Sequence, residues 1–151
     1  PLFVREHEAL RIYSGPTEDA SPPDELIDLT PLIDQQLLQV VDLETEDERS
    51  SYVTFLARVD RGEAETGSIA YHRNYAIGTD DRAAIRLFSQ HIPSIQQIPT
   101  LLFVKHWQET AAPPVGTIQQ ALHNISIRAH YRPKANHTLF PWWHAHFHSN
   151  S

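Results

Sequence analysis

Short apolar runs alternate with amphipathic helical patterns along the chain, and this alternation restricts the fold more than any other feature. Between Glu46 and Val59, for example, Tyr52, Phe55 and Leu56 recur at the spacing of one helix face. The pattern predicts further helices over residues 63–73, 82–90, 99–109 and 115–130, and strands over residues 37–43, 75–78 and 94–98. Strands that alternate with helices predict an α/β sandwich with a mainly parallel sheet. A separate helical pattern from Val4 to Ile12 precedes them.

Composition excludes several classes of function. The 151 residues are one domain's worth of sequence, and a hydrophobic share of 40% is ordinary for a globular protein. The absence of cysteine rules out disulfide scaffolds, thiolate zinc sites and cysteine nucleophiles. The longest apolar runs, such as Leu101–Val104, are too short to cross a bilayer, and no signal segment opens the chain. We therefore expect a cytoplasmic protein without a membrane partner.

Charge is distributed unevenly along the chain. Residues 1–48 hold 13 acidic and 2 basic residues, whereas residues 49–151 hold 6 acidic and 10 basic ones. This split predicts an acidic region and a mildly basic face, although solvated surface alone would also explain it.

Three acidic residues should meet at one edge of the predicted sheet. A helix from Glu63 to Arg73 rises about 16 Å, and the strand that follows returns about the same distance. Glu63 should therefore lie near Asp80 and Asp81, at the carboxyl end of the strand. That edge is where open α/β sheets bind ligands.

Two interpretations of these acids compete. Carboxylates that converge repel one another, and a hard cation such as Mg²⁺ or Mn²⁺ would relieve the repulsion. Taken singly, Asp80 or Asp81 is better explained as the N-cap of the next helix, and Glu63 as a favourable charge near a helix start. For the three acids together, the metal interpretation is favoured.

The same segment resembles a known family. Asp60-Arg61-Gly62-Glu63-Ala64 is followed by Thr79-Asp80-Asp81-Arg82, and this pair of motifs is similar to the signature of PIN-domain nucleases, particularly the bacterial group related to VapC-type toxins. Val4–Leu10 resembles the family's helix with an early acidic residue, best matched by Glu8, and Gly116–Ile125 resembles its later helical part. The resemblance covers roughly residues 2–130.

The resemblance implies a fold, an activity and a set of site residues. The fold is a PIN-like three-layer α/β/α sandwich spanning residues 1–131, followed by a Pro/Trp/His-rich tail at residues 132–151. The activity is Mg²⁺- or Mn²⁺-dependent hydrolysis of RNA by the toxin of a type II toxin–antitoxin pair, with an antitoxin or a second copy as further partners. The implied catalytic metal ligands are Glu8, Glu63, Asp80 and Asp81, with Asp60 in the outer shell, and the implied substrate-binding residues are Thr79, Arg82 and Arg86. Pairing of the two arginines with the acids is the alternative to RNA contact.

PIN domains open with a strand that carries an Asp, and no such strand precedes Pro1. We therefore expect the chain to be an N-terminally incomplete or degenerate relative, with nuclease activity belonging to the full-length protein. A non-catalytic module that binds nucleic acid or a protein is the first alternative to the nuclease. A receiver-like phosphoacceptor is the second, and the position of Lys105 inside a helical pattern disfavours it.

The tail contains two further patterns. Trp142 and Trp143 are expected to cover the underside of the domain or to lie in a loose tail. The run His144-x-His146-x-His148 would place three imidazoles on one side of an extended segment, as a metal site requires. Its position near the end of the chain favours incidental capture of Ni²⁺ or Zn²⁺ over a dedicated site.

Overall fold

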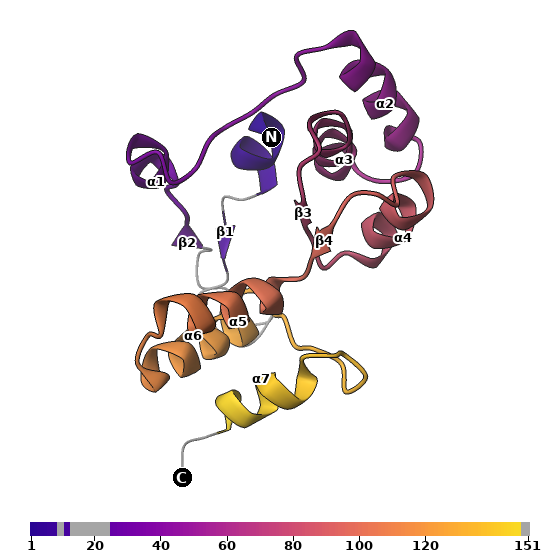
Figure 1. Cartoon of the computed structure of the whole chain (residues 1–151). Coiled ribbons are helices and arrows are strands. Elements are labelled where there is room, and N and C mark those ends of the chain that lie inside the picture. The colour runs from indigo at the N-terminus through magenta and orange to yellow at the C-terminus, as the bar shows by residue number, and fades with distance from the viewer. Residues whose placement is uncertain (9–10, 13–24, 149–151) are drawn as a thin grey trace. The chain divides into compact units, whose positions relative to one another are not determined.

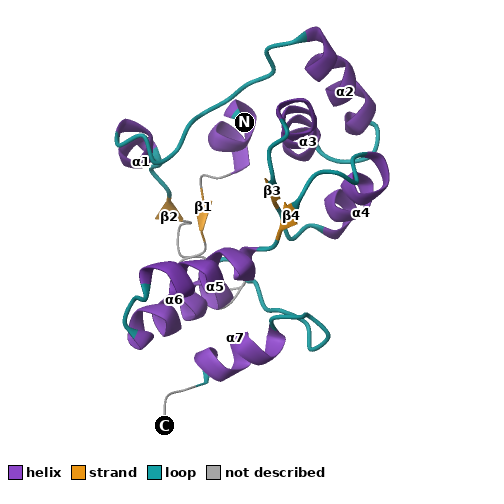
Figure 2. Cartoon of the chain, viewed as in Figure 1, coloured by secondary structure: helices purple, strands orange, loops and turns teal. Residues whose placement is uncertain are grey.

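The computed structural model describes residues 1–8, 11–12 and 25–148 (Figure 1). These residues are mainly helical, and their strands are only two residues long (Figure 2). The elements in chain order are η1 (Val4–Glu8), β1 (Arg11–Ile12), β2 (Glu25–Leu26), α1 (Thr30–Asp34), α2 (Glu46–Leu56), α3 (Arg61–Arg73), β3 (Ile77–Gly78), α4 (Arg82–His91), β4 (Gln97–Ile98), α5 (Thr100–Ala111), α6 (Val115–Arg128) and α7 (Phe140–Phe147). Within the described ranges, no helix is long and apolar enough to cross a membrane.

The chain divides into two compact units. Unit 1 consists of residues 1–10 and 27–100, and unit 2 consists of residues 11–26 and 101–151. Residues 132–148, which belong to the predicted tail, thus share unit 2 with α6 and nearly all of α5. The predicted domain boundary after residue 131 stays a prediction.

Helices α2 and α3 pack against each other in unit 1. The start of α2 is fixed by a local cap, and α3 presents small residues to it. A capping box begins α2: Glu48 N donates to Thr45 Oγ1 over 3.1 Å, and Thr45 N donates to Glu48 Oε2 over 3.0 Å. The partner helix is lined with small residues, among which Ser68 donates its hydroxyl to the carbonyl of Glu48. The small side chains of α3 allow its backbone to lie close to α2.

The core of unit 1 lies between α2, α3 and α4. Phe55 and Phe88 meet edge to face, with ring centroids 6.1 Å apart. Gly67 is required beside them, because a Cβ at this position would overlap the Phe88 ring. The buried residues of this core are Phe55, Ala64, Ala70, Ile77, Ala84, Leu87, Phe88, Ile92 and Ile95. The helical stripes predicted from the sequence in α2 and α4 therefore face this core, apart from Leu56, which is exposed.

A small parallel sheet follows α3 and α4. β3 and β4 pair in parallel, Ile77 opposite Gln97 and Gly78 opposite Ile98. One more backbone hydrogen bond continues the pairing beyond Gly78: Thr79 N donates to Ile98 O over 3.2 Å. Both strands lie inside the ranges predicted from the sequence. The described residues show this small sheet and not the three layers of a sandwich, which remain a prediction.

Two predicted elements are wrong. The apolar run Leu37–Leu43 is not a buried strand: it is irregular, and Leu37 is 68% exposed. No neighbouring strand pairs with this run within the described part of the chain, so its backbone has no ladder to join. The helix predicted from Val4 to Ile12 ends early, because Val4–Glu8 form a short π-helix and Arg11–Ile12 pair antiparallel with Glu25–Leu26.

Unit 2 has a core of its own, built by α5, α6 and α7. Its buried residues are Leu101, Ile118, Leu122 and Trp143. The neighbouring Trp142 donates its indole N–H to Gln108 Oε1 over 2.8 Å. Trp143 is therefore a core residue, and the segment predicted to be a tail contributes a packed helix.

Candidate functional site

The predicted acidic site begins at the start of α3. Asp60 is the N-cap of this helix, and its Oδ1 accepts a hydrogen bond from Glu63 N over 2.9 Å. A carboxylate at this position satisfies a free amide and interacts favourably with the helix dipole. Because Glu63 lies in the first turn, its side chain is held close to Asp60.

Asp81 is the N-cap of α4. Its Oδ1 accepts hydrogen bonds from Ala83 N over 2.6 Å and from Ala84 N over 2.9 Å. The turn before it is held by Thr79, whose Oγ1 accepts from Asp81 N over 3.1 Å. The alternative prediction of an N-cap is thus confirmed for Asp81, and Thr79 supports that cap.

The structure brings Glu63 and Asp81 together, as the lengths of α3 and the following strand predicted. Their side chains hydrogen-bond to each other. Burial, and then the charges of Asp60 and Asp81, raise the pKa of Glu63 to about 7. The amides of Ala84 and Ala83 hold the pKa of Asp81 below its ordinary value. Below about pH 7, Glu63 is therefore mainly protonated beside an ionised Asp81.

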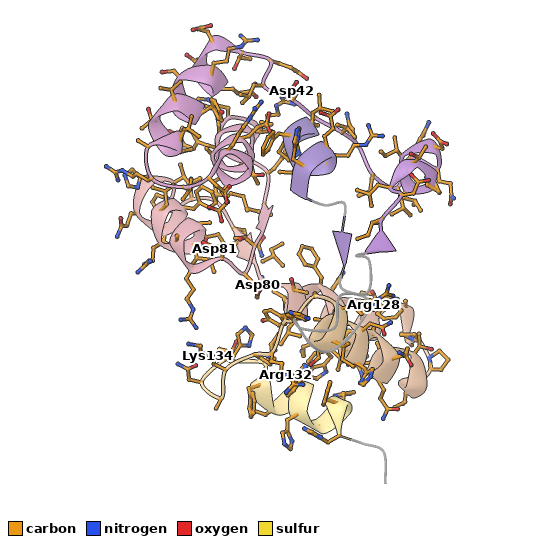
Figure 3. All side chains as sticks on the ribbon, turned by 180° about the vertical axis from the view of Figure 1, so that it is seen from behind. Asp42, Asp80, Asp81, Arg128, Arg132 and Lys134 are labelled. Carbon is orange, nitrogen blue, oxygen red and sulfur yellow. The ribbon has the colours of Figure 1, made fainter. Side chains whose placement is uncertain are left out.

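Asp80 points elsewhere, although it is adjacent to Asp81 in the chain (Figure 3). Its Oδ2 accepts a hydrogen bond from the amide of Thr100, the first residue of α5, over 3.1 Å. The prediction that Asp80 joins the site is not supported by this contact, which commits the carboxylate to a helix start. Adjacent acids cap two different helices here.

The remaining predicted residues are Glu8, Arg82 and Arg86. Glu8 ends η1, and its side chain lies outside the described residues. Arg82 and Arg86 are exposed on α4. The charge of Arg86 contributes to lowering the pKa of Asp81, and the predicted pairing of the two arginines with the acids stays a prediction.

The described residues contain no group of three or more His, Asp or Glu side chains arranged to hold a metal ion. Asp60, Glu63 and Asp81 are electrostatically coupled, yet they are not positioned as a ready set of ligands. Their donor chemistry still fits Mg²⁺ or Mn²⁺, because all are carboxylate oxygens. Both caps bind the helix amides through Oδ1 of the aspartate.

The raised pKa of Glu63 predicts a specific pH dependence of stability. A carboxyl whose folded-state pKa lies above its ordinary 4.5 contributes stability below about pH 4.5, and this contribution is lost as the pH rises through about 7. We expect Glu63→Gln to remove this pH dependence. As the pH rises from about 4.5 to about 7, the free energy of unfolding of the variant should therefore increase relative to that of the wild type. Urea unfolding followed by circular dichroism across this range measures the effect. The exposed control Glu46→Gln should follow the wild type, and parallel curves for Glu63→Gln and wild type would contradict the shared proton.

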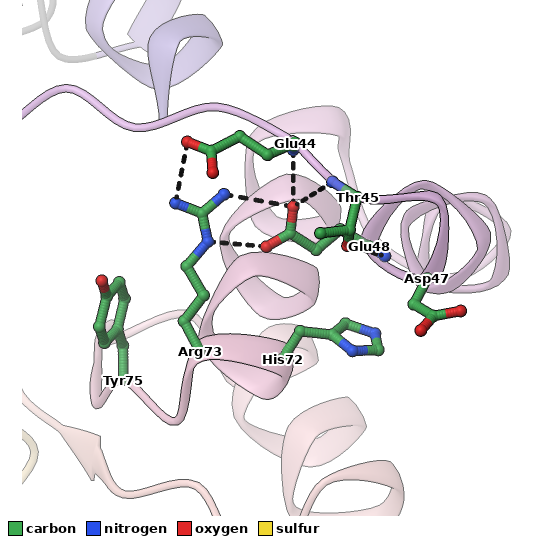
Figure 4. A pocket seen from close by; sticks show the side chains of 7 residues that line it. All are labelled: Glu44, Thr45, Asp47, Glu48, His72, Arg73 and Tyr75. Atoms are coloured by element: carbon green, nitrogen blue, oxygen red, sulfur yellow. Dashed lines mark hydrogen bonds and ion pairs between the residues drawn. The ribbon is translucent and has the colours of Figure 1, made fainter.

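Sequence reasoning missed a second charged cluster, between α2 and α3 (Figure 4). Glu48 is buried. Its Oε1 accepts a hydrogen bond from Arg73 Nε over 2.7 Å, and its Oε2 accepts one from Arg73 Nη2 over 3.2 Å. The hydrogen bond from Arg73 is the main reason that the pKa of Glu48 falls to about 2. A surface pocket of about 540 Å³ lies beside the pair and is lined by Glu44, Thr45, Asp47, Glu48, His72, Arg73 and Tyr75. The only sequence signal was the Thr45-x-x-Glu48 capping box, which does not reveal its distant partner.

Glu65 is a buried acid of α3. Burial, and then its hydrogen bond and proximity to Asp42, raise the pKa of Glu65 above its ordinary value. This pair lies on a different part of α3 from Glu63, beside a pocket that also contains Arg49 and Arg61. Within unit 1, carboxyl groups are thus coupled at two places along the first turns of α3.

No protein-family model, curated protein or solved structure matches this chain.

Proposed function

We propose that the protein is a metal-dependent endoribonuclease of the PIN type, using Mg²⁺ or Mn²⁺ and resembling the toxin of a type II toxin–antitoxin pair. The observation that carries the proposal is the pairing of Glu63 with Asp81 across seventeen intervening positions of the chain. These two residues come from the two motifs that resemble the family signature. The finer fold, an α/β/α sandwich, belongs to the same proposal, as do RNA and a cognate antitoxin as partners.

Each residue has a role in this proposal. Glu63 and Asp81 would hold the cation, in place of the proton that they share, with Asp60 beside them. A bound Mg²⁺ would supply an activated water and stabilise negative charge on the scissile phosphate. Arg82 and Arg86, exposed on α4, would contact the RNA backbone electrostatically. Thr79 would keep Asp81 oriented through its hydrogen bond to the Asp81 amide.

RNA cleavage tests the proposal directly. In the full-length protein, the double variant Glu63→Gln, Asp81→Asn should cut labelled RNA in Mg²⁺ at least about a hundredfold more slowly than the wild type. The substitutions keep the fold, because glutamine is nearly isosteric and asparagine is as good an N-cap as aspartate. Asp34→Asn, at the exposed end of α1, is the matched control and should cut normally. Equal cutting by the double variant and the wild type would overturn the assignment.

A second readout does not depend on cleavage. A cation that binds only the folded state adds RT ln(1 + [L]/Kd) to stability, which is about 2.7 kcal/mol at a hundredfold excess over Kd. Mg²⁺ or Mn²⁺ should therefore raise the melting temperature of the wild type and of Asp34→Asn, and not that of the double variant.

A non-catalytic module that binds nucleic acid or a protein partner is the second candidate. It is favoured by the lack of a three-ligand metal group among the described residues. Retained RNA binding in EDTA, without cleavage in Mg²⁺ or Mn²⁺, would select this function over the nuclease.

A further inference from the structure

The histidine run at the end of the chain is helical, and this changes which imidazoles lie together. His144 belongs to α7 and His148 is its C-cap, so the two residues are four apart on one face of the helix. Their ring centroids are 4.5 Å apart. The prediction of three imidazoles on one side of an extended segment is therefore wrong, and a pair replaces the trio.

His146 is turned away from this pair and is fully engaged. Its Nδ1 donates to the carbonyl of Trp142 over 2.8 Å, and its Nε2 accepts from the amide of Gln108 over 2.9 Å. Since both ring nitrogens are used, His146 has none left for a metal ion. It acts as a link between α7 and α5.

His144 and His148 differ from His146 in this respect. Both are exposed, and within residues 25–148 their ring nitrogens make no hydrogen bond. Their described contacts are with aromatic rings, such as Phe140 against His144 and Trp143 against His148. From residue 110 to residue 151, the sequence also lacks any Asp or Glu that would pair with an imidazolium. The pair is thus free to act as a ligand.

We propose that His144 and His148 together bind one divalent transition-metal ion of the class that prefers imidazole, such as Ni²⁺, Zn²⁺ or Cu²⁺. Two histidines four residues apart on a helix can reach the same ion, with bonds to nitrogen of about 2.0–2.1 Å in the case of Zn²⁺. Water would complete the coordination. The site is chemically distinct from the carboxylates of unit 1, whose oxygens suit Mg²⁺.

The consequence of binding would be structural. α7 is only eight residues long, its N-cap has no side-chain hydrogen bond, and isolated helices of this length are unstable in water. An ion that bridges His144 and His148 would lock the last turn of the helix. Because the same helix presents Trp143 to Leu101, Ile118 and Leu122, the ion would also stabilise the core of unit 2.

Calorimetric titration of the full chain with NiCl₂, after removal of metal by EDTA, tests the site. The wild type should bind one Ni²⁺ in this region, and His144→Asn and His148→Asn should each weaken binding at least about tenfold. His146→Asn, two residues from each, is the matched control and should bind normally. Unchanged affinity in the double variant His144→Asn, His148→Asn, or the same loss in His146→Asn, would overturn the proposal.

Amide hydrogen exchange provides the second measurement. Ni²⁺ should slow exchange in α7 of the wild type and of His146→Asn, and not in His144→Asn or His148→Asn. The variant Glu63→Gln, Asp81→Asn should keep this response, so that the histidine site and the proposed nuclease can fail independently. Ni²⁺ that binds without any added protection of α7 would refute the structural role.

Discussion

Arg73→Ala should lower the free energy of unfolding by about 3–5 kcal/mol, because it leaves a buried carboxylate without its cation. Glu48 is 1% exposed. Without Arg73 it keeps the amides of Glu44 and Thr45 but loses both of its charged donors. The substitution also removes the bond from Arg73 Nη2 to the carbonyl of Asp42. Urea unfolding followed by circular dichroism measures the loss.

A surface ion pair provides the matched control. Lys105 Nζ lies 2.6 Å from Glu109 Oε1, and the two side chains are 31% and 57% exposed. Lys105→Ala should therefore cost at most about 1 kcal/mol. Arg73→Lys should fall between these results, because it keeps the charge but not the fork of donors. A cost for Arg73→Ala no greater than for Lys105→Ala would contradict the importance of the buried pair.

The same pair should make unit 1 sensitive to acid. The pKa of Glu48 is lowered from 4.5 to about 2, so its stabilising contribution is complete above about pH 4.5 and is lost as the pH falls towards 2. Arg73→Ala should lack most of this component. Its unfolding free energy should therefore change less than that of the wild type over this interval.

Phe88→Ala should destabilise unit 1 by about 3–5 kcal/mol, because it empties the centre of the core. The ring is 1% exposed, meets Phe55 edge to face, and lies against Gly67, where a Cβ would overlap it. The surrounding helices are therefore shaped around this ring, and a cavity would remain.

Phe103→Ala is the matched control for this prediction, since it makes the same chemical change in α5 at a side chain that is 51% exposed. It should cost less than about 1 kcal/mol. Chemical denaturation of both variants checks the difference. Similar losses at the two positions would show that Phe88 does not carry the core.

Helices and their buried faces were largely predictable from the sequence, because these features depend on residues close together in the chain. The stripe that includes Phe55 in α2, and the one that includes Leu87 and Phe88 in α4, face the core of unit 1. The approach of Glu63 to Asp81 was predictable for a related reason: a helix and a strand of similar length return the chain to the level from which it started.

Tertiary structure decided what depends on distant partners. The sequence alone could not show that Leu37–Leu43 lacks a neighbouring strand. Nor could it show that Asp81 approaches Glu63 while Asp80 binds the start of α5. It also did not reveal that Glu48 pairs with Arg73, 25 residues away. The histidine run is the clearest case. Its spacing of two residues suits an extended strand, and packing of Trp143 in unit 2 accompanies a helix instead. An apolar or ionisable residue specifies what must be buried or paired, but the partner that satisfies it is set only when distant segments pack together.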